Sequence, residues 1–258
     1  IEKQADLAKQ LGIELFVLDD GWIRSGNDSR SSMGDWVCNE KKLPGGINTA
    51  ADLIRGKGLQ FGLWFEPEAV SENSDLYRKH PGWALQIPGY QAVKGRHEFL
   101  LDLSIKEVRD YLFDKLSFYL DDGKVDYVKW DMNRPLTDVN SFMLAREEKG
   151  EISHRYVLGL YELLERITKK YPEVLIEGCS SGGARFDPGM LYYVPQNWTS
   201  DNTDAYDRAM IQKGYSLLYP QITMGAHVSI VPNHQTGRST SLHSRYQVAR
   251  LFNLGYEL

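Results

Sequence analysis

Acidic residues close several apolar, strand-like runs of this sequence. The run LFVL is followed by Asp19 and Asp20, and the later runs YVKW and NWTS are followed by Asp131 and Asp201. Two carboxylates held at the ends of separate strands are the equipment of glycoside hydrolysis. The pattern therefore predicts a catalytic rim of acids, and the alternative is a set of unrelated strand terminators.

The segment DYVKWD carries the first reactive candidate. Alternation along a strand places Tyr127, Lys129 and Asp131 on one face. A cation one pleat away favours the ionised carboxylate that a nucleophile needs. Asp131 is therefore the predicted nucleophile, and the alternative is a buried ion pair that only fills space.

The segment WTSDNTD offers the second carboxylate. Asp201 is the predicted acid that protonates a leaving oxygen, whereas Asp204 is the natural N-cap of the helix that follows. Such a pair lies about 5 to 5.5 Å apart in retaining glycosidases and farther apart in inverting ones.

Other residues near these acids are candidates for holding a sugar. Asp19 and Asp20 are adjacent acceptors for neighbouring hydroxyls. Trp64 suits stacking on a sugar face, although an aromatic residue in a strand is more often core. Cys179 has no histidine nearby in sequence and is a poor nucleophile candidate. Gly182 begins a glycine pair that allows close backbone approach or simply a turn.

Histidines give little sign of a metal. His227 and His234 flank VSIVPN and are the best candidates for a metal site, but the sequence has neither His-x-His nor His-Glu-x-x-His. We therefore predict no metal and no cofactor.

Composition narrows the partners and the compartment. The chain has 258 residues, a formal charge of -5 and 12% aromatic residues. It shows no basic stripe and no apolar stretch of membrane-spanning length, so neither nucleic acid nor membrane is the expected partner. Aromatic residues among carboxylates suit a neutral sugar. With Cys38 and Cys179 as the only cysteines, a reducing, cytoplasmic location is favoured, although one bridge remains open.

Strand-like and helix-like segments alternate, which predicts βα units around a mainly parallel sheet. We expect strands near 13–19, 60–66, 126–131, 173–179, 197–201 and 221–229, with a partial one near 254–258. We expect helices near 1–11, 49–57, 105–120, 154–170, 205–218 and 240–252, the third opened by a capping box of Ser104 and Glu107.

Loop lengths favour a (β/α)8 TIM barrel. The long loops, near 20–48, 67–104, 132–153 and 180–196, follow strands, as in barrels whose active site lies at the carboxyl ends of the strands. A doubly wound sheet is the competitor, but no Gly-x-Gly-x-x-Gly follows the first strand. The chain opens within an amphipathic helix and ends just after an apolar run. We expect residues 1–258 to be one catalytic domain, cut at both ends and lacking the first strand of the barrel.

Several longer motifs resemble one known family. They are FVLDDGW, GLWFEPE, YVKWDMN, EGCSSGGARFD, WTSDNTD, GAHVS and PNHQT, in this order through almost the whole chain. They are similar to the α-galactosidases of glycoside hydrolase family 36. The resemblance implies a TIM barrel and a retaining double displacement on α-1,6-linked galactosides such as melibiose and raffinose, without a metal.

The resemblance also assigns roles to residues. It implies Asp131 as nucleophile and Asp201 as acid/base, the roles reached from the strand ends. It implies a galactose subsite lined by Asp19, Asp20, Trp64, Arg96, Lys129, Cys179 and Gly182, with Asn133 and Trp198 in the same wall. Relatives carry a β-sandwich before this segment and a β domain after it, and full-length members form homo-oligomers such as tetramers.

The sequence therefore predicts a retaining α-galactosidase that acts on galactoside oligosaccharides. An α-N-acetylgalactosaminidase or a galactosyl transferase of the raffinose-synthase kind is the alternative on the same fold. A metal-dependent barrel hydrolase and a non-catalytic sugar-binding domain are more distant alternatives. Glu66, Glu68 and Glu177 are expected to support the reacting acids.

Overall fold

The computed structural model describes residues 1–23 and 31–257. Within these residues the chain forms two compact units, Ile1–Leu175 and Ile176–Leu258, which we call the first and second unit. The expectation of a single domain stays a prediction, and each unit is described by itself.

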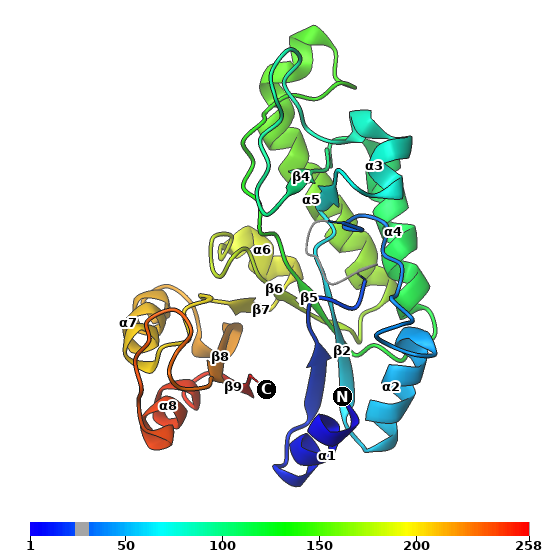
Figure 1. Ribbon diagram of the computed structural model, residues 1–258. Coiled ribbons are helices and arrows are strands. Elements are labelled where there is room, and N and C mark those ends of the chain that lie inside the picture. Colours follow the sequence, from blue (N-terminus) through cyan, green and yellow to red (C-terminus); the bar gives the residue numbers. More distant parts are fainter. Residues whose placement is uncertain (24–30, 258) are drawn as a thin grey trace. The chain divides into compact units, whose positions relative to one another are not determined.

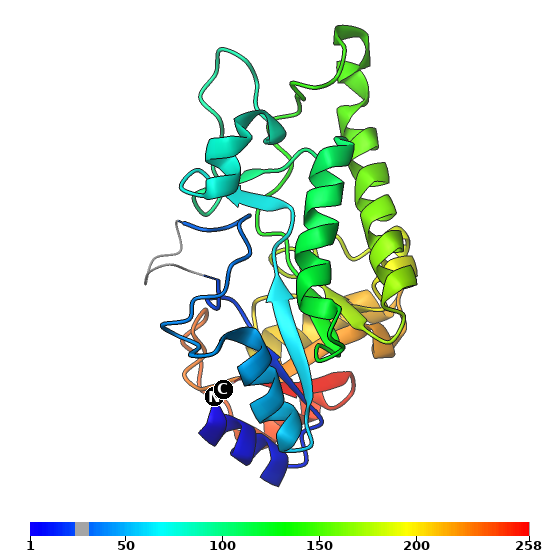
Figure 2. The same cartoon turned by 90° about the vertical axis from the view of Figure 1, so that its right-hand side faces the viewer.

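The first unit is built from βα repeats (Figures 1 and 2). Its three main strands are parallel in the order β1-β2-β5, and they comprise β1 (Leu15–Leu18), β2 (Gln60–Phe65) and β5 (Tyr127–Trp130). The helices between and beside them are α1 (Glu2–Gln10), α2 (Gly46–Gly56), α4 (Lys106–Leu120) and α5 (Ile152–Lys170). Parallel pairing aligns the carboxyl ends of β2 and β5, because Phe65 pairs with Trp130.

The loops that follow these strands have structure of their own. After β2 the chain forms a small antiparallel pair, with helices in the same loop, and a 3₁₀ turn precedes α5. These pieces are β3 (Ala69–Ser71), α3 (Asp75–Lys79), η1 (Pro81–Trp83), β4 (Glu98–Leu100) and η2 (Arg146–Glu151).

Helices α4 and α5 pack side by side in the first unit (Figure 2). Their buried residues recur at three- and four-residue spacing, as in Leu160, Leu163, Leu164 and Ile167 of α5. Gly159 allows the helix to approach the chain before α4, because a Cβ atom there would lie 1.9 Å from the carbonyl oxygen of Leu103. Any side chain at this position would force the two segments apart.

The second unit continues the parallel pattern in the order β6-β7-β8-β9. Its strands are β6 (Leu175–Gly178), β7 (Gln196–Trp198), β8 (Met224–Val228) and β9 (Asn253–Tyr256). Its helices are α6 (Pro188–Tyr193), α7 (Ala205–Ser216) and α8 (Leu242–Ala249), with a 3₁₀ turn η3 (Gln221–Thr223) before β8.

The structure confirms each expected strand and each expected long helix, within a few residues at the ends. The expected capping box of α4 is wrong. The side chain of Ser104 donates to Asp102 instead, and Ile105, which offers no side-chain cap, is the N-cap residue. The short elements α3, α6, β3 and β4 were not expected, because their apolar patterns are too brief to show a period.

Candidate active site

Asp131 follows β5 directly and is almost fully buried. Three N–H groups donate to its carboxylate. The Asn133 amide lies 2.6 Å from Oδ2, the Trp64 indole nitrogen 3.3 Å from the same oxygen, and the Met132 backbone nitrogen 2.8 Å from Oδ1. Donors on both oxygens fix the orientation of this carboxylate.

A second buried carboxylate, that of Glu66, also contacts Asn133. The Asn133 amide also donates to Glu66 Oε2 at 3.0 Å, and its backbone N–H donates to the other oxygen of Glu66. Asn133 therefore bridges Glu66 and Asp131. Burial, and then the negative charge of Asp131, raises the pKa of Glu66 to about 7, against the opposing effect of its hydrogen bonds with Asn133.

Trp64 is held by a cluster of aromatic side chains. Its ring lies 6.3 Å from that of Trp36, and its carbonyl accepts a 2.8 Å hydrogen bond from the indole of Trp22. Phe65 and Tyr119 contact Trp22 in the same cluster. Since Trp64 is only 1% exposed, its indole N–H is the part that the structure brings to Asp131, and stacking on a sugar stays a prediction.

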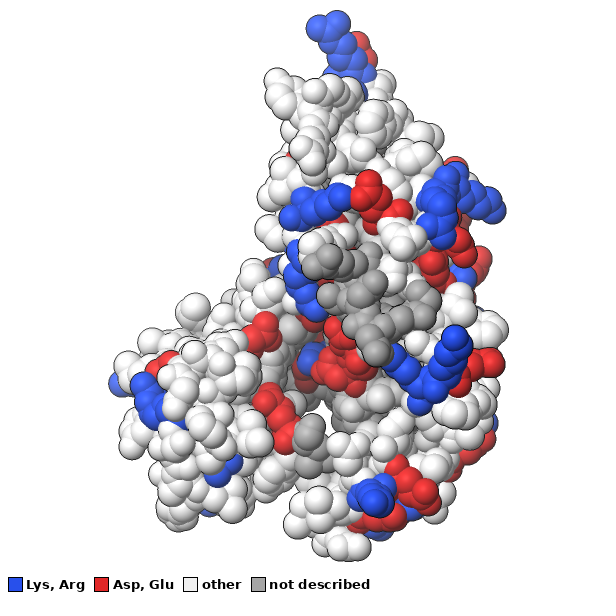
Figure 3. Space-filling view, viewed as in Figure 1, with Lys and Arg blue, Asp and Glu red and all other residues white. Residues whose placement is uncertain are grey.

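Two basic residues pair with the acids after β1. Lys129 Nζ lies 2.6 Å from Asp19 Oδ2, and an Arg96 guanidinium nitrogen lies 3.5 Å from Asp20 Oδ2 and 4.0 Å from Glu66 Oε2. Figure 3 shows acidic side chains gathered over β1 and β2, with basic ones beside them. Burial lowers the pKa of Arg96, but the charges of Glu66, Glu98, Asp20 and Asp131 outweigh it and leave that pKa raised.

The first unit thus contains seven of the predicted site residues, and hydrogen bonds join them in three groups. Asp131 accepts from Trp64 and Asn133. Lys129 donates to Asp19, and Arg96 donates to Asp20.

In the second unit, Asp201 lies in the turn between β7 and α7. The indole nitrogen of Trp198 donates to its Oδ1 at 3.0 Å, and the Gln235 side chain donates to its backbone carbonyl at 3.1 Å. The residue itself is exposed. Asp204 caps α7 as predicted, accepting from the backbone N–H groups of Tyr206 and Asp207.

Gly182 lies against the turn that carries Asp201. It has a φ of +92°, and a Cβ atom there would lie 2.7 Å from the Cα atom of Ser200. A side chain at this position would displace the turn. Cys179, just after β6, is buried, and Cys38 is partly buried. Among the described residues neither cysteine forms a disulfide.

Three features of the site were missed or underrated in the sequence. Arg208 holds the turn around Asp201, Gln235 bonds to the carbonyl of Asp201, and Glu66 shares Asn133 with Asp131. Arg208 gave no signal, since an arginine within a helix usually faces water. Gln235 lies in the motif PNHQT, which marked the region but not the residue.

Neither a metal cluster nor a membrane helix occurs in the described part of the chain. No group of three or more His, Cys, Asp or Glu side chains there could hold a metal ion, His227 and His234 included. Among the same residues, no helix combines the length and apolar character needed to cross a bilayer.

Comparison with known proteins shows the family to which the chain belongs. The family profile named Melibiase matches residues 1–258. The chain belongs to the melibiase family. This confirms the resemblance seen in the motifs, and solved relatives in this family are described as GH36 α-galactosidases.

Individual melibiase relatives are closely similar. Alpha-galactosidase AgaA of Geobacillus stearothermophilus is 54% identical over 254 residues, which cover 98% of this chain and 35% of AgaA. The bifunctional alpha-galactosidase/sucrose kinase AgaSK of Mediterraneibacter gnavus is 53% identical, over 98% of this chain and 26% of AgaSK. The chain thus spans about a third or less of the length of these relatives.

Solved structures of the family show the same fold. The crystal structure of AgaA superposes with a TM-score of 0.98 at 53% identity, covering 100% of this chain and 36% of AgaA. AgaA variants have been solved with 1-deoxygalactonojirimycin, raffinose and stachyose. The parallel βα repeats are those of an incomplete (β/α)8 barrel, as predicted.

Proposed function

We propose that this melibiase segment carries the catalytic residues of a retaining α-galactosidase. The observation that carries the proposal is the setting of Asp131, a buried carboxylate at a strand end with N–H donors on both oxygens. A carboxylate fixed in this way has its free lone pairs directed for attack on an anomeric carbon. The names of both relatives described above include alpha-galactosidase.

The proposed reaction is a double displacement. Asp131 attacks the anomeric carbon and forms a covalent galactosyl-enzyme, while Asp201 protonates the leaving oxygen. Asp201 then removes a proton from water, which attacks the same carbon, breaks its bond to Asp131 and releases galactose with retained configuration. Each step reverses the protonation state of Asp201 and leaves that of Asp131 unchanged.

The solved AgaA complexes support this pair of residues. The chain bound to raffinose carries an aspartate-to-asparagine change, and the chain bound to stachyose carries an aspartate-to-alanine change. The two changed positions are separated by the same number of residues as Asp131 and Asp201. Replacing a catalytic carboxylate is the usual way to keep a substrate intact in a complex.

The predicted sugar contacts follow from the same proposal. Asp19 and Asp20, already oriented by Lys129 and Arg96, accept hydrogen bonds from galactose hydroxyls. Trp64, Asn133, Cys179, Gly182 and Trp198 complete the wall of the galactose subsite. The substrate is an α-1,6-linked galactoside oligosaccharide, the protein is cytoplasmic, and it acts as a homo-oligomer.

The test uses the intact protein with aryl α-galactoside, aryl α-N-acetylgalactosaminide and raffinose. We expect preferential hydrolysis of the galactosides, with the α-anomer of galactose as the first product by NMR. Preference for the N-acetylated sugar, or transfer to sucrose in place of hydrolysis, would favour the alternatives on the same fold. Loss of activity on chelation would favour a metal-dependent hydrolase, and binding without turnover a sugar-binding domain.

A further inference from the structure

The turn that carries Asp201 is held by one buried arginine. Arg208 belongs to α7 and is 2% exposed. Its Nη2 donates to the carbonyl of Ser200 at 2.9 Å, and its Nε donates to the carbonyl of Asn202, also at 2.9 Å. One guanidinium therefore binds the two backbone carbonyls on either side of Asp201.

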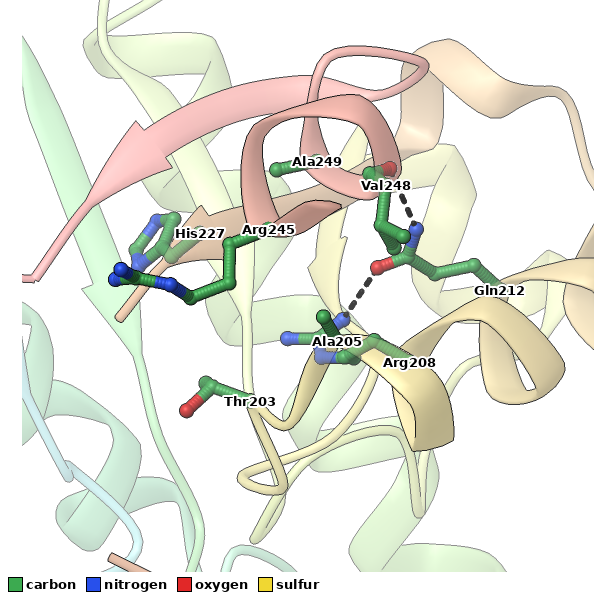
Figure 4. Close-up of a pocket in the computed structure, with 8 residues that line it drawn as sticks. All are labelled: Thr203, Ala205, Arg208, Gln212, His227, Arg245, Val248 and Ala249. Atoms are coloured by element: carbon green, nitrogen blue, oxygen red, sulfur yellow. Dashed lines mark hydrogen bonds between the residues drawn. The ribbon is translucent and has the colours of Figure 1, made fainter. Parts of the chain in front are cut away.

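The remaining nitrogen of Arg208 ties this turn to the sheet. Nη1 donates to the carbonyl of Gly225 in β8 at 3.2 Å and to the hydroxyl of Thr199. It also donates to Gln212 Oε1 at 3.3 Å, a contact drawn in Figure 4 beside the pocket that Arg208 lines. The side chain thus joins α7, β8 and the turn after β7 through a planar group with fixed donor directions.

Arg208 also contacts the side chain that bonds to Asp201. Its guanidinium carbon lies 4.2 Å from the ring centroid of Trp198, whose indole nitrogen donates to Asp201. The Trp198 ring lies 4.4 Å from that of His227 as well. Arg208 is therefore connected to Asp201 by two routes, through the backbone of the turn and through Trp198.

Stability alone is a poor reason to bury this cation. The hydrogen-bond acceptors of Arg208 are neutral oxygens, and a buried charge without a carboxylate partner is costly. Burial lowers the pKa of Arg208 to about 10, although Glu257, Asp201, Glu177 and Cys179 oppose this effect. The guanidinium is still charged at neutral pH, and it donates hydrogen bonds to the turn.

We propose that Arg208 is a positioning residue for Asp201, one that sets the depth and direction of this carboxyl group through its neighbouring carbonyls. The inference rests on the proposed acid/base role of Asp201. A displaced acid harms bond breaking most where the leaving group needs a proton, so the defect should depend on the substrate. A purely structural arginine would lower activity on all substrates alike.

The test compares Arg208→Lys with the parent in the intact protein, using raffinose and 2,4-dinitrophenyl α-galactoside. Lysine keeps the charge but cannot bind both carbonyls. We expect kcat/KM on raffinose to fall by about 10² because the acid is misplaced, while the first step with the dinitrophenyl substrate changes little. Azide, which replaces base-assisted water, should accelerate turnover of that substrate by the variant. Equal losses on both substrates without azide rescue would overturn the proposal.

Arg109→Lys is the matched control. Arg109 also donates to two backbone carbonyls, those of Leu103 and Ser104, but in the first unit. It should lose stability without any dependence on the leaving group. If Arg208→Lys does not fold, Gln235→Ala decides, since it frees the carbonyl of Asp201 from an exposed side chain. A smaller loss with the same dependence on the leaving group supports the proposal. The absence of that dependence overturns it.

The same assay on Asp201→Asn separates the two proposals. Leaving-group dependence in Asp201→Asn but not in Arg208→Lys means that the positioning role fails while the acid/base role stands. If Asp201→Asn shows no dependence on the leaving group, the proposed function itself fails.

Discussion

The two candidate carboxylates are held in opposite ways. Asp131 is buried, and three N–H groups contact its carboxylate oxygens directly. Asp201 is exposed, and within the described residues the Trp198 indole is the one donor to its carboxylate. Its support goes instead to the backbone, where Arg208 and Gln235 bind the carbonyls of residues 200–202.

This difference matches two kinds of chemistry. A nucleophile keeps its charge until it forms a bond, so donors on both oxygens can stay in place through the cycle. An acid/base must gain and lose a proton, and each extra N–H on its oxygens would oppose protonation. The bonds to the backbone fix the position of Asp201 without placing further donors on its carboxyl group.

The largest effect is expected from Asp131→Asn. Asparagine keeps the shape but cannot form the covalent intermediate, so kcat should fall by about 10⁴ or more on every galactoside. Rates on an aryl α-galactoside and on raffinose, measured with the intact protein, check this. Undiminished hydrolysis of the aryl substrate would contradict the nucleophilic role.

Asp201→Asn should be more selective. Loss of a general acid/base costs about 10² to 10⁴ in rate, and the first step should suffer most with raffinose, whose leaving group needs a proton. Pre-steady-state rates with raffinose and dinitrophenyl galactoside would show the contrast. An equal reduction on both substrates would remove the difference drawn between Asp131 and Asp201.

Asn133→Ala tests the direct support of Asp131. The change removes the 2.6 Å donor to Asp131 and leaves two carboxylates without their bridge, so we expect kcat to fall by about 10². Asn140→Ala is the control, because Asn140 donates to the Gln86 carbonyl in the same unit. If both variants lose only stability, Asn133 is not part of the active site.

Glu66→Gln should change how stability depends on pH. The pKa of Glu66 is raised from 4.5 to about 7, so between these values the folded chain binds more protons than the unfolded chain. The free energy of unfolding therefore falls as pH rises through this window, by on the order of 3 kcal/mol, and the loss is complete above pH 7. The variant lacks this loss.

Thermal unfolding of the parent and of Glu66→Gln from pH 4 to 8 provides the measurement. The Tm of the parent should decline relative to the variant between pH 4.5 and 7, and the two curves should run parallel above that range. Curves that stay parallel throughout would show that Glu66 does not bear the raised pKa.

Features that depend on local interactions could be predicted from the sequence. Strands and long helices follow from periodicity, and Asp204 caps α7 because an aspartate before a helix binds its free N–H groups. The capping box at Ser104 failed because Asp102, two residues earlier, takes the serine hydroxyl. A sequence motif does not show which of several competing hydrogen bonds between near neighbours will form.

Contacts between segments that are far apart in the sequence could not be predicted from it. The bond from the Lys129 ammonium to Asp19, 110 residues away, was not predicted. Arg208 is buried only because β8 and the turn after β7 close over α7. The family motifs predicted Asp131 and Asp201 as the reacting carboxylates, but the groups that contact them depend on tertiary packing.

Trapping the covalent intermediate tests the division of roles most directly. A galactosyl fluoride with a second ring fluorine, which slows hydrolysis of the intermediate, would be incubated with the intact protein, and the digested peptides sequenced by mass spectrometry. We predict a single galactosyl label on Asp131. A label on Asp201, or on neither aspartate in a protein that turns the reagent over, would contradict the assignment.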